Sequence, residues 1–149
     1  MKTTIALLSV TLLVSAGALA APAAKKAAAL SPQKYVMVDH STELLLDKTA
    51  ARTIWTETIP AKVWKLYPPK RWGFLTEVEG GFNAANTCVV SARVTMLPLG
   101  VNGKTLLFNP EKTTSTFDAS RTATKEQCVE LARGKLREAI HAMIAALGG

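Results

Sequence analysis

Asp39-His40-Ser41 contains the three residue types of a hydrolase triad, but in consecutive positions. In a working triad the histidine hydrogen-bonds to both partners, and the three residues normally come from distant segments of the chain. Neighbouring residues of a strand point to opposite faces, so these three side chains cannot converge. The motif therefore predicts ordinary residues at the end of a strand.

The other side chains that could do acid–base or metal chemistry are isolated. Glu77 and Glu79 share one face of a predicted strand and could form a carboxylate pair, but we interpret them as a solvated face, and Asp118 as a turn or cap residue. His141 belongs to the polar face of a predicted helix. With two histidines in the chain and both cysteines expected to be oxidised, a zinc site of the usual kind lacks ligands. We therefore predict no catalytic residue, no metal site and no cofactor.

The pair Gly80-Gly81, followed by Phe82 and Asn83, is too short and wrongly spaced for a loop that binds phosphate. We interpret the two glycines as residues that let the chain turn between strands. The loop 80–87 could still present side chains to a partner. The first candidate binding residues are therefore Phe82 and Asn83.

The segment KVWKLYPPKRWGF (62–74) holds four aromatic residues, two prolines and four basic residues. Trp72 and Phe74 follow the alternation of a half-buried strand, so we expect them in the core. The Pro68-Pro69 corner is expected to expose the side chains beside it. Aromatic and arginine residues in loops are frequent anchors of protein interfaces. The second set of candidate binding residues is therefore Tyr67, Lys70 and Arg71.

Cys88 and Cys128 are the only cysteines of the chain. In 87–97 apolar residues alternate with polar ones, which predicts a strand with Cys88 on its buried face. From Thr124 onward apolar residues recur at three- and four-residue spacings, which predicts an amphipathic helix with Cys128 on its apolar stripe. A redox-active pair usually has closely spaced cysteines. We therefore predict a structural disulfide that pins the helix to the strand.

The first 20 residues predict export. Lys2 precedes an apolar run, and Ala18-Leu19-Ala20 places small residues at the −3 and −1 positions of a cleavage site. The apolar stretch is shorter than the roughly 20 residues that span a bilayer, so cleavage after Ala20 or Ala21 is favoured over an N-terminal membrane anchor. No cysteine lies near this site, so we expect no lipoprotein.

After cleavage, residues 21–32 are expected to form a flexible Ala/Pro/Lys leader and residues 33–149 a single domain. Removing residues 1–20 takes away one charge, that of Lys2, so the net charge falls from +7 to +6. A basic exported domain tends to meet anionic envelope surfaces, acidic glycans or acidic proteins, whereas export argues against nucleic acid. We expect a periplasmic or secreted protein without a membrane span, in an oxidising compartment.

Most other segments have the composition of strands. We expect strands at 35–38, within 51–67 on either side of Pro60, and at 71–79, and a hairpin over 105–117 with its turn at 109–112. These elements predict an α+β fold, a curved antiparallel sheet of about five or six strands with one long C-terminal helix on one face. The second arm of the hairpin is polar and suits a sheet edge.

These features favour a small, non-enzymatic binding module, for instance an inhibitor or immunity-type protein, that engages a protein or an anionic macromolecule of the envelope. The corner 68–71 and the neighbouring loops are the expected surface. The alternative is a structural or assembly component of the envelope that acts by sheet-edge pairing through 113–117. An enzyme whose site the sequence disguises is the third hypothesis.

Overall fold

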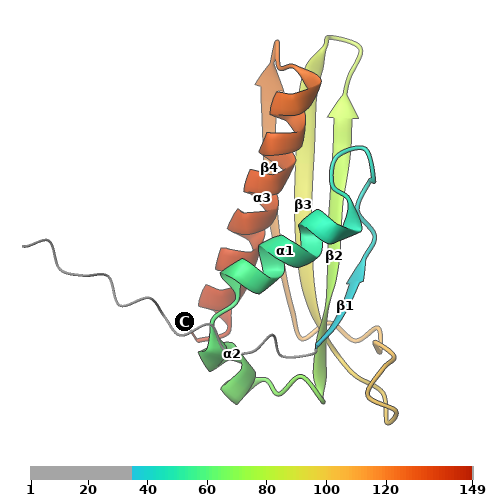
Figure 1. Cartoon of the computed structure of the whole chain (residues 1–149), viewed down its shortest axis with the longest axis vertical. Coiled ribbons are helices and arrows are strands. Elements are labelled where there is room, and N and C mark those ends of the chain that lie inside the picture. The colour runs from blue at the N-terminus through green and yellow to red at the C-terminus, as the bar shows by residue number, and fades with distance from the viewer. Residues whose placement is uncertain (1–34, 149) are drawn as a thin grey trace, which may run out of the picture.

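The computed structural model describes residues 35–148, so the predicted signal peptide (1–20) and leader (21–32) lie outside the described residues. The chain forms three helices and four strands there, in the order β1 (Val36–Asp39), α1 (Lys48–Thr58), α2 (Ala61–Leu66), β2 (Trp72–Phe82), β3 (Thr87–Pro98), β4 (Lys112–Arg121) and α3 (Lys125–Ala146). The strands lie in the order β1-β2-β3-β4 (Figure 1).

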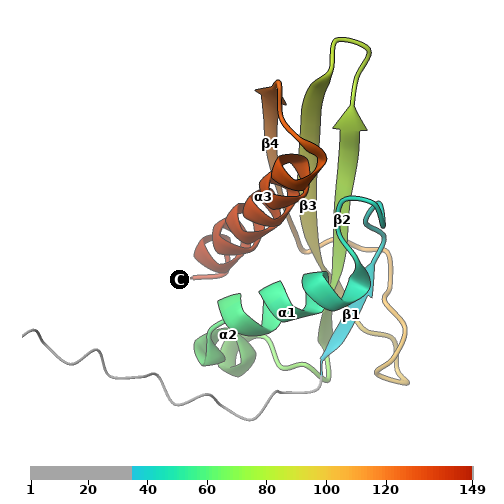
Figure 2. The same ribbon diagram turned by 45° about the horizontal axis from the view of Figure 1, so that its top comes forward.

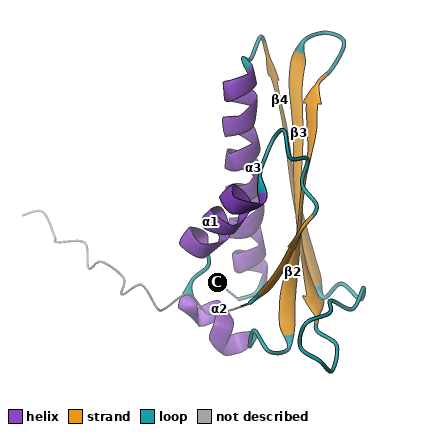
Figure 3. Cartoon of the chain, turned by 45° about the vertical axis from the view of Figure 1, so that its right-hand side comes forward, coloured by secondary structure: helices purple, strands orange, loops and turns teal. Residues whose placement is uncertain are grey.

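The sheet is mixed, because β1 is parallel to β2 and the other two pairs are antiparallel. Helices cover one face of it, with α3 lying along β3 and β4, as two views show (Figures 2 and 3). The predicted α+β class and the C-terminal helix on the sheet are confirmed. The predicted five or six antiparallel strands are wrong, since the described residues form four.

The largest error concerns 51–67, where we expected two strands and the chain forms α1 and α2. Threonine, isoleucine and tryptophan favour strands on average. However, Ala51, Ile54 and Trp55 have helical spacing, and all three are buried. Asp47 caps α1 by accepting hydrogen bonds from the backbone N–H groups of Thr49 and Ala50. Burial of one helical face therefore outweighs the intrinsic preference of the residues.

The two helices also explain the parallel strand. Pro60 is the N-cap of α2 and not a bulge between strands. Together α1 and α2 carry the chain from the end of β1 back to the start of β2. Parallel neighbours need such a crossover connection, whereas antiparallel ones need only a turn.

The predicted hairpin over 105–117 is also wrong. Residues 99–111 form an irregular connection between β3 and β4, with a single bridge between Leu99 and Leu106. No hairpin turn forms at 109–112, and β4 begins at Lys112. Within the described sheet β4 pairs only with β3, so the polar segment 113–117 does lie at a sheet edge.

The core lies between α3 and the sheet. The disulfide Cys88–Cys128 joins β3 to the first turns of α3 with a Cα–Cα distance of 5.8 Å, which confirms the predicted bridge. Thr124 caps α3 in a capping box with Gln127. The alternation predicted for β3 is also confirmed, because its helix-facing side chains are all fully buried: Cys88, Val90, Ala92, Val94 and Met96.

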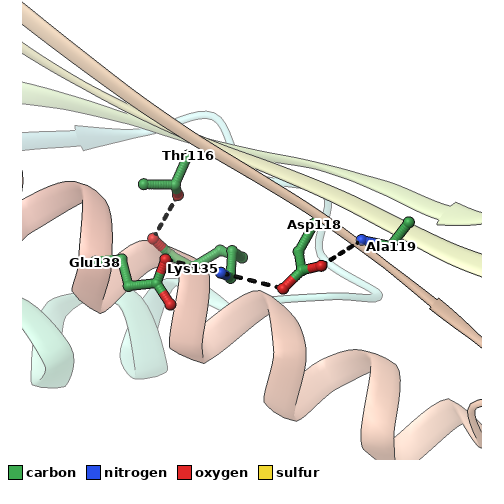
Figure 4. A network of polar contacts seen from close by, with 5 residues as sticks. All are labelled: Thr116, Asp118, Ala119, Lys135 and Glu138. Carbon is green, nitrogen blue, oxygen red and sulfur yellow. Dashed lines mark hydrogen bonds and ion pairs between the residues drawn. The ribbon is translucent and has the colours of Figure 1, made fainter.

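A polar network ties α3 to the edge strand (Figure 4). Lys135 Nζ lies 3.2 Å from Asp118 Oδ2 and 2.7 Å from Glu138 Oε2. Asp118 also accepts a hydrogen bond from the backbone N–H of Ala119, and this bond and Lys135 hold the pKa of Asp118 below its usual value. The same network, with Glu138 as the larger contributor, raises the pKa of Lys135. Asp118 is thus a strand residue that binds a helix, not the turn or cap residue that we expected.

Candidate functional site

The consecutive Asp39-His40-Ser41 has a structural role. Asp39 Oδ1 accepts hydrogen bonds from the backbone N–H and the hydroxyl of Ser41, at 3.1 and 2.6 Å. Ser41 Oγ in turn accepts a hydrogen bond from the backbone N–H of Val78 at 3.0 Å. The side chain of His40 is exposed. These contacts fix the end of β1 against β2 and make no nucleophile–histidine pair.

The carboxylates on the open face of the sheet are solvated. Glu77 Oε2 lies 3.7 Å from Arg93 Nη1 across the β2–β3 pair, and Glu79 beside it is exposed. His141 is exposed on α3. Within residues 35–148 no group of three His, Cys, Asp or Glu side chains could hold a metal ion. In the described part of the chain these side chains therefore form one ion pair, Glu77 with Arg93, and no metal-binding group.

The five predicted binding residues lie at opposite ends of one strand. Tyr67, Lys70 and Arg71 come just before β2, whereas Phe82 and Asn83 are at its far end (Figure 1). A strand of 11 residues is roughly 35 Å long. The structure therefore separates these residues into two surfaces, which cannot form one small site.

At the β2–β3 turn the two predicted residues have different surroundings. Asn83 Oδ1 accepts hydrogen bonds from the backbone N–H groups of Ala85 and Thr87, both at 3.0 Å, so this side chain builds the turn. Phe82 is partly exposed, and together with Leu44 it lines an apolar cleft of about 260 Å³ beside Cys128. This end therefore offers a shallow apolar hollow and an amide whose oxygen is engaged within the turn.

At the other end of β2 the corner is a tight turn. The carbonyl oxygen of Pro68 accepts hydrogen bonds from the backbone N–H groups of Arg71 and Trp72. Lys70 and Arg71 are exposed, as expected, but Tyr67 is half-buried, with its ring edge-on to Trp72 and the centroids 6.0 Å apart. Tyr67 therefore supports the corner and is not part of an exposed tip. Phe74 is fully buried and Trp72 packs against the core, as predicted.

The surface that sequence reasoning missed is the β3–β4 connection, residues 99–111, which packs against this corner. The backbone N–H of Leu99 donates to the carbonyl oxygen of Arg71 at 2.8 Å. A Cβ placed on Gly73 would lie 2.8 Å from Leu106 Cδ2, so Leu106 packs directly on the backbone of β2. Both segments lie at the same end of the molecule (Figure 1).

Three bulky apolar side chains of this connection face water. Val101 is fully exposed, Phe108 is 84% exposed and Leu107 is 48% exposed. The segment LGVNGKTLLF (99–108) indicates a loop, because glycine and asparagine interrupt the apolar residues and no two-residue alternation remains, but it does not indicate which of these residues are exposed. We call the combined surface the apolar–basic end; it consists of Lys70, Arg71, Val101, Lys104, Leu107 and Phe108.

Positive charge at the apolar–basic end is not compensated nearby. The chain has no acidic residue from 58 to 76, and Glu111 is the one acidic residue in 99–111. Among the ion pairs of the described residues, none involves Lys70, Arg71 or Lys104. The end therefore presents cations and exposed apolar side chains side by side.

None of the helices within 35–148 has both the length and the apolar character needed to cross a bilayer. Comparison of the chain with protein families, with curated proteins and with solved structures gives no match. The function therefore has to be inferred from the surface of the molecule itself.

Proposed function

We propose that this protein is a small exported, non-enzymatic binding module that engages an anionic partner in the cell envelope through its apolar–basic end. One observation carries the proposal: Val101 and Phe108 are almost wholly exposed on a connection that contacts the corner of the unpaired cations Lys70 and Arg71. Clustered apolar side chains on a protein surface are typical of contact sites. An inhibitor or immunity-type protein is one form that such a module would take.

The two kinds of side chain have different roles in this proposal. Burying a side chain such as that of Val101 or Phe108 in a partner contributes roughly 1.5–3 kcal/mol each. Lys70, Arg71 and Lys104 attract and orient an anionic partner and make the association sensitive to salt. The sheet, held to α3 by the disulfide, is the rigid scaffold that presents the two segments.

Capture from an envelope extract tests the surface. The double variant Lys70→Glu with Arg71→Glu is expected to capture less partner than the wild type, because both charges reverse at the contact. Both side chains are exposed, so the melting temperature should change little. Mass spectrometry of the captured species identifies the partner.

A matched control separates the surface from the overall charge. Lys48→Glu with Arg137→Glu makes the same change in net charge at two exposed positions outside the apolar–basic end, and it should leave capture intact. Equal capture by wild type and the Lys70/Arg71 variant, or equal losses in both double variants, would reject this surface.

Export is part of the proposal and has its own test. The N-terminal residue of the protein recovered from the periplasm or the medium should be Ala21 or Pro22, as mass spectrometry can determine. A chain that stays in the cytoplasm with Met1 in place contradicts export.

A second candidate, assembly by sheet-edge pairing, is favoured by the free edge of β4. The carbonyl oxygen of Met96 accepts from the N–H of Glu111, so Met96 directs its backbone groups toward β4. Because backbone groups alternate in direction along an antiparallel strand, the register then points the N–H and C=O groups of three β4 residues outward: Thr113, Ser115 and Phe117.

Chemical crosslinking in the envelope tests this second candidate. Ser115→Pro removes one outward N–H and should abolish a crosslinked product that forms by strand addition. A strict monomer in size exclusion, with no crosslinked envelope partner, would count against edge pairing.

A further inference from the structure

We propose that the partner of the apolar–basic end is the surface of an anionic lipid bilayer. The 99–111 connection would insert Val101, Leu107 and Phe108 at the boundary between headgroups and acyl chains, while Lys70, Arg71 and Lys104 contact lipid phosphates. This inference rests on the proposed function, because it concerns the same surface, and it names the class of partner.

The shape of the end is the first argument. Val101 and Phe108 are almost wholly exposed to solvent. The apolar cleft at Phe82 and a second hollow at Asn83 and Arg121 lie at the opposite end of the sheet, and no residue of the apolar–basic end lines either of them. A fluid bilayer deforms around a protruding apolar side chain, so it accepts such a side chain without a matching pocket.

The second argument is the combination of signals. One short apolar element or one group of cations alone gives weak, reversible attachment to a bilayer, and stable attachment takes both. Here the two signals come from adjacent segments, since Gly103 lies beside the carbonyl oxygen of Lys70. Basic residues close to an anionic leaflet add attraction that falls off within a Debye length.

The third argument is the backbone of the tip. Gly100 N–H donates to the carbonyl of Thr105, and Gly103 N–H donates to the carbonyl of Gly100. Asn102 Oδ1 accepts from the N–H groups of Lys104 and Thr105. Val101 is thus presented on a turn in which four backbone N–H groups are satisfied locally, those of Gly100, Gly103, Lys104 and Thr105. This lowers the cost of moving the tip out of water, where unsatisfied backbone groups are expensive.

Cosedimentation with vesicles tests the inference on the protein purified after export. The protein should bind vesicles of equal parts phosphatidylglycerol and phosphatidylcholine, and about tenfold or more weakly those of phosphatidylcholine alone. Rising salt should weaken binding to the anionic vesicles, because it screens the cations. Equal binding to both kinds of vesicle would overturn recognition of an anionic surface.

A pair of double variants isolates the tip. Val101→Ser with Phe108→Ser should weaken binding to the anionic vesicles by about tenfold or more. Leu44→Ser with Phe117→Ser is the matched control, because it also removes two exposed apolar side chains, 89% and 68% exposed, but away from the tip. The variants are identical before Tyr35, so any effect of the segment that remains there after cleavage is common to all. Equal losses in both double variants would overturn the assignment of the tip.

Fluorescence gives a direct readout of insertion. The variant Phe108→Trp should gain quenching by brominated lipids in anionic vesicles, whereas Phe117→Trp should not. Quenching that is the same in the two variants contradicts insertion of the 99–111 connection.

Two failures are distinguishable. If the protein does not bind vesicles but envelope capture still depends on Lys70 and Arg71, the bilayer inference is overturned and the proposed function stands, with an anionic protein or glycan as partner. If neither vesicle binding nor capture depends on these residues, both proposals fall.

Discussion

Bulky apolar side chains are frequent in two regions, the interface between α3 and β3 and the apolar–basic end. The interface buries them, whereas the apolar–basic end exposes them. At the interface Leu136 and Ile140 are fully buried, whereas at the end Val101 and Phe108 face water. The difference follows from backbone regularity. A helix and a strand place apolar residues on one side at a fixed period, while an irregular turn cannot turn all of them inward.

The charges of the two regions differ in the same way. The side chain of Lys135 on α3 is only 12% exposed and lies between Asp118 and Glu138. Its charge is therefore paired with two carboxylates of the same fold. Lys70, Arg71 and Lys104 form none of the ion pairs in the described residues. The α3–β3 interface therefore serves stability, and the apolar–basic end is available for contact. Four predictions test this division.

The largest expected contrast is between two phenylalanines. Phe74 packs against Trp55 and Trp64 in the core, with ring centroids 4.5 and 5.9 Å away, so Phe74→Ala should lower the free energy of unfolding by about 3–5 kcal/mol. Phe108→Ala should change it by less than about 0.5 kcal/mol. Urea denaturation followed by tryptophan fluorescence measures both. Similar losses in the two variants would show that the 99–111 connection belongs to the core.

Removal of the disulfide should have the next largest effect. The bridge closes a loop with a sequence separation of 40 residues, for which the loss of chain entropy in the unfolded state is about 4 kcal/mol. The double variant Cys88→Ala with Cys128→Ala should therefore lose stability by up to this amount in denaturant titration. At temperatures where the variant is folded, capture through the apolar–basic end should persist. Unchanged stability would contradict the structural role of the bridge.

A buried hydrogen bond gives a smaller effect in the same core. Trp55 Nε1–H donates to the hydroxyl of Thr76 at 2.8 Å, and both residues are fully buried. Thr76→Val leaves this N–H without a partner and should cost about 1–3 kcal/mol in thermal or urea unfolding. Thr95→Val is the control. The hydroxyl of Thr95 lies 3.4 Å from the hydroxyl of Thr113, and because Thr113 is exposed, water can replace the lost partner. A larger loss at Thr95 would contradict this interpretation.

The smallest effect is expected at the edge of the interface, and it depends on pH. The pKa of Asp118 is lowered from 3.8, so the ionised carboxylate stabilises the fold above that pH, and this contribution is lost as the pH falls through the lower folded-state pKa. Asp118→Asn should therefore reduce the melting temperature slightly at neutral pH. Below pH 3.8 its difference from the wild type should shrink, as calorimetry can check. A melting-temperature difference that grows on acidification would contradict a stabilising role of the ionised Asp118 carboxylate.

The predictable parts of the fold are the segments in which a regular spacing of apolar residues continues over many residues. In β3 a two-residue alternation persists from Cys88 to Met96, and in α3 the helical spacing persists over 22 residues. Each pattern predicts which side of its element, β3 or α3, is buried. Each of these buried sides holds one cysteine. The disulfide could therefore be predicted together with the two elements that it joins.

Shorter segments were not predictable for a physical reason. In 51–67 the residue types favour strands. The helical spacing there is limited to a short set of apolar residues, which become buried when α1 packs against α3 and β1. In the candidate site the sequence indicated Lys70 and Arg71, which are exposed, but not Val101 and Phe108, which the same end presents. Apolar residues in a loop have no local signal that tells whether a neighbouring segment covers them.

The amino-acid sequence is enough to predict the long helix, the strand that it covers, the disulfide between them and the excess of positive charge. These are properties of local period, residue type and count. Three further features are visible only in the folded chain: β1 runs parallel to β2, Tyr67 packs inward, and the 99–111 connection meets the 68–71 corner. The reason is that these outcomes depend on contacts between segments far apart in the chain, for which no single segment carries the information.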